Sequence, residues 1–158
     1  MKKAAFVPAL LAFLLVASSC QSGSSPLSPN SGEIVEASGL KLVASASGQG
    51  TGGLSFLIQL KNEGTGSVSL KFSDSQVFDI SVSDLAGGLV WKWSHDKAFA
   101  QYVWQLDLKP GDADSRNADW DLKANDGAQV TPRIYRVKVW ITSSPRDPAL
   151  SVTFSITI

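Results

Sequence analysis

The chain has 158 residues, with 14 basic and 14 acidic side chains that give a formal net charge of zero. Lys2 and Lys3 belong to an N-terminal targeting pattern, so the remaining chain carries 12 basic and 14 acidic residues, a net charge of −2. Binding to nucleic acid needs a basic surface, so we expect no nucleic-acid partner. A single cysteine excludes a disulfide framework, and the length suits one domain that folds without disulfides or metals.

The first 20 residues have the pattern of a bacterial lipoprotein signal peptide. Two lysines precede an apolar run at residues 4–17, which is too short to span a membrane as a helix. The run ends in Ala17, Ser18, Ser19 and Cys20, which resemble a lipobox although Ala17 replaces the usual leucine. The sequence therefore predicts acylation of Cys20 and stable membrane anchoring, because each buried CH₂ contributes ~0.8 kcal/mol. The alternative is an ordinary cleavage site with an unrelated cysteine.

Residues 21–32 are rich in Ser, Gly and Pro and predict a tether, because they contain too little apolar surface to order themselves. Gln21 follows Cys20 in place of an aspartate, which favours the outer membrane in a cell with two membranes. We therefore expect the folded domain, residues 33–158, to lie at the cell envelope on a lipid anchor.

Short runs of alternating apolar and polar residues fill the chain from Glu33 onward, and each predicts a strand with one buried face. Gly87 and Gly88, between two of these runs, predict a hairpin turn. Eight or nine such strands without an amphipathic helix predict a single-domain, all-β fold, an immunoglobulin-like antiparallel β-sandwich. The runs are residues 40–44, 54–61, 68–73, 78–83, 89–94, 99–108, 118–122, 135–141 and 150–158.

Patterns that would indicate an enzyme or a cofactor site lack the context that they need. The Gly-rich residues 48–53 fit a dinucleotide motif, but a strand rather than a helix follows them. An EF-hand at Asp112 and Asp114 would need an oxygen ligand where Arg116 stands, so a solvated acidic face is favoured over a loose Ca²⁺ site. His95 is the only histidine, and no nucleophile motif accompanies it. We expect no enzyme, no metal and no cofactor; a hydrolase using His95 is the least favoured function.

Tryptophans mark a candidate core and a candidate contact surface. Trp91 and Trp93 share a face with Leu89, which predicts that at least one of the two belongs to the core. Trp140 points the same way as Arg136, away from the apolar face of its strand. Trp140 either covers the outer side of a sheet, which is the favoured interpretation, or forms an exposed anchor for a protein partner.

A set of residues between positions 54 and 141 follows an order that one known family shows. The set includes Asn62, Phe72, Ser75, Gln76, Val77, Asp84, Gly88, Val90, Lys92, Phe99, Gln101, Pro110, Gly111, Asp112, Trp120 and Tyr135. Its most specific part is Phe78 and Asp79, followed by Trp91, Trp93 and Ser94. In these residues the chain resembles the BsuPI-type intracellular proteinase inhibitors. It departs from them at residues 132–135, where Pro-Arg-Ile-Tyr replaces a Pro-Gly before the tyrosine.

The resemblance implies a protein partner, a serine protease, whose active-site cleft an extended loop of this domain would enter. One candidate loop is residues 143–148, where two prolines flank Arg146 and stiffen the chain. The other is residues 94–98, which include His95. Candidates for partner contact are thus Arg146, Trp140 and His95. The expected function is that of a membrane-anchored β-sandwich binding module that inhibits a protease. The alternative is a structural or assembly lipoprotein of the cell envelope without inhibitory activity.

Overall fold

The computed structural model describes residues 30–36, 38–48, 52–144 and 150–158. These residues form ten strands and no helix, and all strand pairs are antiparallel, which confirms the all-β prediction. Within the same residues, no helix has the length and apolar character needed to cross a membrane. The strands are β1 (Ser31–Val35), β2 (Leu40–Gly48), β3 (Leu54–Asn62), β4 (Val68–Phe72), β5 (Phe78–Ser83), β6 (Leu89–Lys92), β7 (Trp104–Leu108), β8 (Ala113–Trp120), β9 (Ile134–Ile141) and β10 (Ser151–Thr157).

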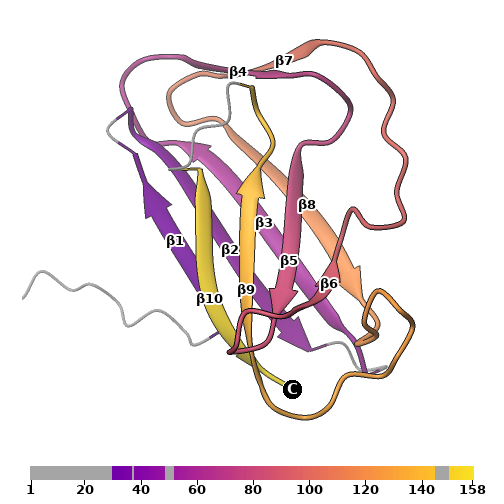
Figure 1. Ribbon diagram of the computed structural model, residues 1–158. Coiled ribbons are helices and arrows are strands. Elements are labelled where there is room, and N and C mark those ends of the chain that lie inside the picture. Colours follow the sequence, from indigo (N-terminus) through magenta and orange to yellow (C-terminus); the bar gives the residue numbers. More distant parts are fainter. Residues whose placement is uncertain (1–29, 37, 49–51, 145–149) are drawn as a thin grey trace, which may run out of the picture.

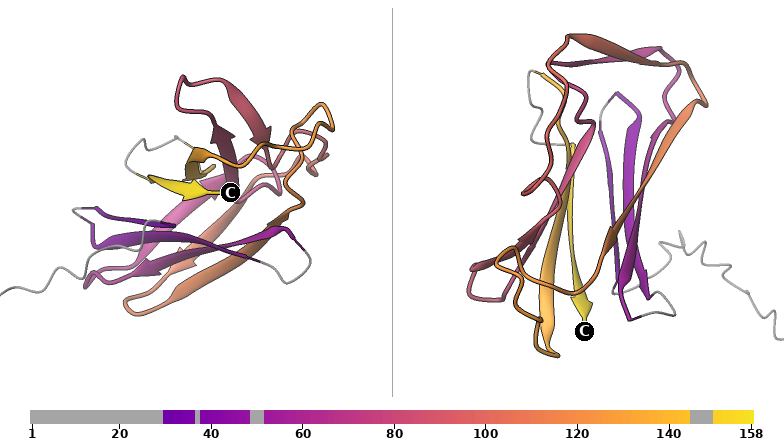
Figure 2. Two further views of the ribbon diagram at one scale, coloured as in Figure 1. Left: turned by 90° about the horizontal axis from the view of Figure 1, so that it is seen from below. Right: turned by 90° about the vertical axis from the view of Figure 1, so that its right-hand side faces the viewer.

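Two four-stranded sheets face each other, and a two-stranded ribbon closes one end of the sandwich. The first sheet has the order β1-β2-β3-β8, and the second has the order β10-β9-β5-β6. The ribbon of β4 and β7 crosses the end of both sheets (Figures 1 and 2). β4 therefore pairs with β7 and not with β5, although β4 and β5 are neighbours in the sequence.

The core lies between the two sheets and follows the alternation of the strands. In β2, Leu40, Leu42 and Ala44 are buried, whereas the residues between them are partly exposed. In β9, Val137 and Val139 are buried in the same alternating way. Full burial of an aliphatic side chain stabilises a fold by about 1.5–3 kcal/mol, so this period of two determines which face of each sheet turns inward.

The first strand begins within the segment predicted to be a tether. β1 starts at Ser31, and the carbonyl oxygen of Asn30 already accepts a hydrogen bond from the amide of Ala46 at 2.8 Å. Gly32 is buried against β10, where an added Cβ would lie 3.2 Å from the Phe154 ring. The folded part thus begins at least two residues before the predicted boundary at Glu33.

A tyrosine fixes the corner at which the chain enters β9. Tyr135 is buried, and its hydroxyl donates a hydrogen bond to the carbonyl oxygen of Thr131 at 2.8 Å. This contact from a tyrosine to the backbone a few residues upstream is typical of immunoglobulin-like sandwiches. It supports the immunoglobulin-like subtype, which stays a prediction. It also anchors the corner at Pro132 without the Pro-Gly that the resemblance led us to expect.

Two strands differ in length from the predicted runs. β7 starts at Trp104 rather than at residue 99, because its partner β4 ends at Phe72, which pairs with Trp104. Tyr102, which would share a face with Trp104 in a strand that began at residue 99, is therefore exposed. β8 starts at Ala113 rather than at residue 118, because Asp114 and Arg116, on the same side of this edge strand as buried Trp120, are polar and hide its period.

The predicted hairpin joins β5 to β6. The amide of Gly88 donates to the Asp84 carboxylate at 2.8 Å, and only Gly87 of the glycine pair has a positive φ, 93°. Val82 pairs with Trp91 but Ser83 pairs with Leu89, so β6 has one extra residue in a bulge. Leu89 is therefore exposed although Trp91 packs against the core. The shared face predicted for Leu89 and Trp91 is therefore wrong.

Candidate functional site

A buried carboxylate joins the start of β5 to the end of β6. Asp79 is only 3% exposed. Ser94 donates to it from its hydroxyl at 2.7 Å and from its amide at 3.3 Å. The Ile80 amide donates at 2.9 Å, and Lys92 Nζ lies 3.3 Å from the carboxylate. Burial of a charge is costly unless it is paired and hydrogen-bonded, so these contacts hold the chain at Ser94 firmly in place.

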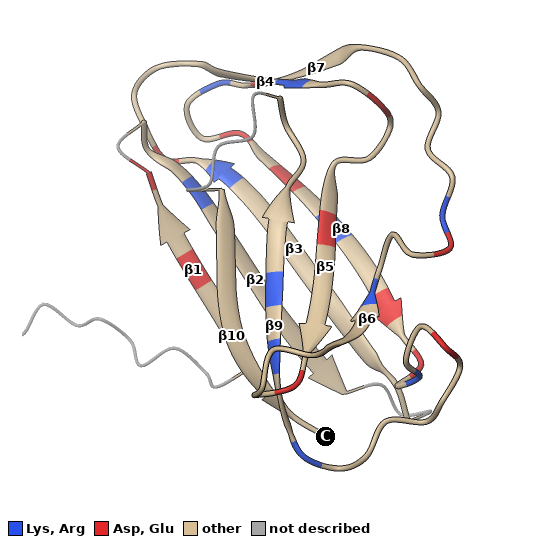
Figure 3. Ribbon diagram, in the orientation of Figure 1, with Lys and Arg blue, Asp and Glu red and all other residues tan. Residues whose placement is uncertain are grey.

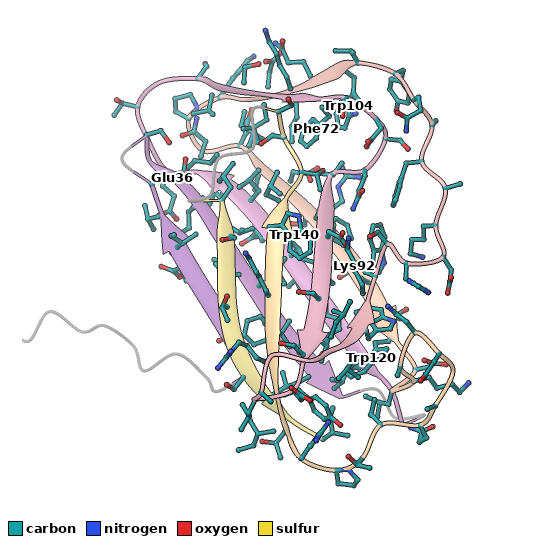
Figure 4. The ribbon with its side chains drawn as sticks, viewed as in Figure 1. Glu36, Phe72, Lys92, Trp104, Trp120 and Trp140 are labelled. Carbon is teal, nitrogen blue, oxygen red and sulfur yellow. The ribbon has the colours of Figure 1, made fainter. Side chains whose placement is uncertain are left out.

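Trp140 lies beside this carboxylate on the outer face of the second sheet. It is the cross-strand partner of Asp79, and Lys92 and Lys138 lie 5.8 and 6.0 Å from its ring centre. Figure 4 shows Trp140 and Lys92 near each other. Trp140 is partly buried. This position favours the interpretation that Trp140 covers the outer side of the sheet, and its role as a partner anchor stays a prediction.

Trp91 and Trp93 pack in two different aromatic groups. Trp91 stacks between Phe56, at 6.0 Å, and Trp120, at 5.3 Å, so it joins the two sheets. Trp93 packs at 4.4 Å on Phe78, at the start of β5. Both tryptophans are partly buried against the core, as the sequence predicts for at least one of them.

A second buried polar side chain fixes the end of the sandwich near the β4–β7 ribbon. Asn62 is fully buried, and its side-chain nitrogen donates to the carbonyl oxygens of Gly66 at 2.7 Å and Leu108 at 2.9 Å. The main-chain carbonyl oxygen of Asn62 accepts a hydrogen bond from the Gly111 amide at 2.8 Å. The turn after β3 and the turn before β8 are thereby joined through Asn62.

The connection from β6 to β7 begins as a tight turn. The amide of His95 donates to the carbonyl oxygen of Lys92 at 3.1 Å, and the amide of Lys97 donates to that of Ser94 at 3.3 Å. Lys97 Nζ lies 4.8 Å from the centre of the Trp93 ring. His95 is exposed, with Nε2 3.5 Å from Asp96 Oδ1. Residues 93–96 form this turn, so over its first part the candidate loop at residues 94–98 lacks the extended form predicted for a loop that enters a cleft.

The rest of this connection runs without a turn or bend from Lys97 to Val103 and is held at two points. Ala100 and Ser75 form two hydrogen bonds, one from the Ser75 amide to the Ala100 carbonyl oxygen and one from the Ala100 amide to the Ser75 hydroxyl, both 3.0 Å long. Trp104 Nε1 then donates to the carbonyl oxygen of Asp74 at 2.7 Å. Gln101, Tyr102 and Val103 lie between these two points and are all exposed.

Trp104 also anchors the connection through its ring. It stacks on Phe72 with 4.7 Å between ring centres, and Figure 4 shows the pair at the end of the sandwich closed by the ribbon. Figure 3 shows no charged residue over most of the connection between β6 and β7. Residues 98–106 contain no Asp, Glu, Lys or Arg. We call residues 101–103, exposed between the two anchors, the 101–103 segment.

Two hollows lie along the β6 edge, with Asn125 between them. One, of about 490 Å³, is lined by Val90 and Tyr135, and the other, of about 360 Å³, is lined by Trp91 and Lys123. The Asn125 amide donates to the Val90 carbonyl oxygen at 3.0 Å, and its Oδ1 accepts from the Lys92 amide at 3.0 Å. Asn125 thus pairs with the Val90 carbonyl oxygen and the Lys92 amide, which another strand would need in order to pair with the free edge of β6.

Asp121 and Lys123, two charged residues that line the smaller hollow, form an ion pair. Asp121 Oδ2 lies 3.0 Å from Lys123 Nζ, and the hydrogen bond between these side chains lowers the pKa of Asp121 below its ordinary value. Asp114, in the acidic segment, bonds Arg116 at 2.8 Å. No three His, Cys, Asp or Glu side chains gather to hold a metal ion in the described part of the chain.

A match to one family model covers most of the sandwich and shows the family of the chain. The family model for BsuPI, the intracellular proteinase inhibitor, matches residues 41–146. The chain belongs to this family. The matched region contains the Asp79 contacts, the Asn62 contacts and the 101–103 segment.

Comparison with known structures and curated proteins adds little to the family assignment. No curated protein matches the chain. Solved structures with similarity include β-glucosidase 3B from Thermotoga neapolitana in complex with α-D-glucose, at 19% identity over 73% of this chain and a TM-score of 0.37. A β-glucosidase from Listeria innocua aligns at 14% identity over 75% of this chain with a TM-score of 0.35. The chain spans only 14% and 16% of the length of these two enzymes.

Of the three residues predicted for partner contact, His95 and Trp140 lie in the described part of the BsuPI domain, and their role in contact stays a prediction. His95 lies in the turn after β6, and Trp140 lies on the outer face of the second sheet. Arg146 and Cys20 lie outside the described residues. Sequence reasoning missed the 101–103 segment, because its alternating pattern indicates a strand. The signals available in the sequence were the lack of charge in residues 98–106 and the presence of Tyr102.

Proposed function

We propose that this BsuPI chain is a membrane-anchored inhibitor of a serine protease. The observation that carries the proposal is the family match over residues 41–146, which includes the β-sandwich from β2 to β9. An inhibitor acts by binding, so it needs a rigid surface and no catalytic group of its own. The buried contacts of Asp79 and Asn62 supply rigidity next to exposed chain.

Membrane anchoring is a separate part of the proposal and rests on the N-terminal pattern. The family is described as intracellular, but the match begins at residue 41, after the predicted signal peptide and Cys20. Acylation of Cys20 would place the domain at the cell envelope, in the outer membrane of a cell that has two, where it meets proteases of that compartment. Labelling cells with radioactive palmitate tests this part: the natural chain should carry label, and Cys20→Ala should not. Equal labelling of both chains would contradict anchoring at Cys20.

Inhibition is tested by titrating subtilisin-type and chymotrypsin-type serine proteases with the purified chain. We expect stoichiometric loss of protease activity at nanomolar concentrations of chain. Full protease activity at micromolar chain, with the chain folded and uncleaved, would contradict the proposal. That result would favour the alternative of a structural or assembly lipoprotein in the cell envelope.

A further inference from the structure

We propose that the 101–103 segment is the part of the chain that enters the protease, with Tyr102 filling the primary specificity pocket. This inference rests on the proposed function and adds to it the contact residue and the protease class. The class is a serine protease whose primary pocket is apolar, as in chymotrypsin, rather than one with a buried aspartate, as in trypsin.

The first support is the way the segment is held. Ala100 is joined to Ser75 by two hydrogen bonds, and Trp104 is fixed by Asp74 and by the Phe72 ring. Both anchors lie on one short stretch, residues 72–75, so only three residues separate two fixed points. A segment that is already ordered loses little conformational entropy on binding, which is what tight inhibition requires.

The second support is exposure. Tyr102 is 52% exposed and Val103 is 81% exposed, although both are large apolar side chains. Figure 1 shows the connection between β6 and β7 running outside the outline of the two sheets, where a cleft on another protein has access to it. Tyrosine is among the residues most often found at the centre of binding surfaces, because it buries a large area with few rotamers to fix.

The third support is charge. Residues 98–106 carry no charged side chain, so no lysine or arginine is available in the segment for a pocket with a buried aspartate. Placing Tyr102 in such a pocket would leave that aspartate buried and unpaired, which is strongly unfavourable. An apolar pocket accepts the tyrosine ring without this penalty.

The test compares variants of the full chain, purified in detergent, in titrations of chymotrypsin, subtilisin and trypsin. Tyr102→Ala should weaken inhibition of chymotrypsin and subtilisin by at least about 30-fold, the size of a hot-spot truncation. Tyr102→Phe should retain inhibition within a few-fold. Tyr102→Lys should lose inhibition of chymotrypsin and gain inhibition of trypsin.

The matched control is Leu85→Ala, because Leu85 is 60% exposed and lies in the distant turn between β5 and β6. It should leave inhibition unchanged, and thermal unfolding should be the same for all variants. If the natural chain inhibits but Tyr102→Ala behaves like Leu85→Ala, the assignment of the segment is overturned and the proposed function stands. If the natural chain inhibits trypsin best, the assignment of an apolar pocket is overturned. If it inhibits none of the proteases, the proposed function fails and this inference with it.

Discussion

Asp79 is a buried charge whose partners all come from the β5–β6 hairpin and the chain just after it. Its contacts with Ser94, Lys92 and Ile80 place the start of the connection that leads to Tyr102. A carboxylate at this position pairs with donors on both strands, which an apolar side chain cannot do. The residue thus couples the stability of the hairpin to the position of the proposed contact segment.

We expect Asp79→Ala to lower the free energy of unfolding by about 2–4 kcal/mol, because it leaves buried donors at Ser94 and Ile80 without their acceptor. Urea denaturation followed by tryptophan fluorescence measures this change. Asp121→Ala is the matched control, since the Asp121–Lys123 pair is largely exposed and such pairs contribute about 0–1 kcal/mol. Equal effects of the two substitutions would contradict the role given to Asp79.

The residues around Asp79 could be recognised from the sequence, but their contacts with one another could not. The order of Phe78, Asp79, Trp91, Trp93 and Ser94 is visible in the sequence and points to the family. The contact between Ser94 and Asp79 follows from the antiparallel register of β5 and β6. Ser81 lies opposite Lys92, so Asp79 lies opposite Ser94 two residues further along. Register depends on the length of the turn and on the bulge, and neither is evident from alternation.

At the scale of elements, the edge of β6 is closed by a single asparagine. The Asn125 amide donates a hydrogen bond to the Val90 carbonyl oxygen, and the Asn125 side-chain oxygen accepts one from the Lys92 amide. An open edge strand is a template for pairing with another chain, so this contact protects the second sheet from such pairing.

We expect Asn125→Ala to expose the Lys92 amide and to speed its hydrogen exchange at least several-fold, because the acceptor at Oδ1 is lost. Amide exchange followed by NMR gives the rate at this one residue. Asn125→Asp keeps an oxygen at the same place and should keep the protection. An unchanged exchange rate in the alanine variant would show that the edge is closed by other groups.

The strands themselves were predicted unevenly, and the differences have physical causes. β2, β3, β5, β9 and β10 bury one face in the core, so their apolar residues alternate and the sequence indicates them. β8 lies at an edge, and the polar residues at Asp114 and Arg116 hide the same period. Residues 99–103 have the period but no partner strand, because β4 ends at Phe72. Alternation therefore predicts strands well only where one face of the strand packs on the core and a partner strand pairs with it.

At the scale of the whole molecule, β1 joins the N-terminal chain to the sandwich. It pairs with β2 along its length, and Gly32 lies against Phe154 and Val152 of β10 in the opposite sheet. A domain that starts at residue 33 would lose part of this strand, and the composition of residues 21–32 gave no sign of it.

We expect a chain that starts at residue 36 to be less stable by about 2–4 kcal/mol than one that starts at residue 30, because it loses strand pairing and buried surface at both sheets. A chain that starts at residue 30 should match the full chain in thermal unfolding. Scanning calorimetry of the three chains measures the differences. Identical transitions for the chains that start at residues 30 and 36 would mean that β1 adds no stability.

The 101–103 segment lies on a rigid frame. The sandwich forms this frame, Asn125 closes its β6 edge, and the buried side chains of Asp79 and Asn62 hold its turns in place. The central claim is that this frame serves to block the active site of a serine protease. The most direct measurement is the binding of the full chain to chymotrypsin or subtilisin, with the protease either free or carrying a covalent peptide inhibitor in its primary pocket. We expect tight one-to-one binding to the free protease and none to the blocked protease. Equal binding to both forms, or no binding to either, would contradict the central claim.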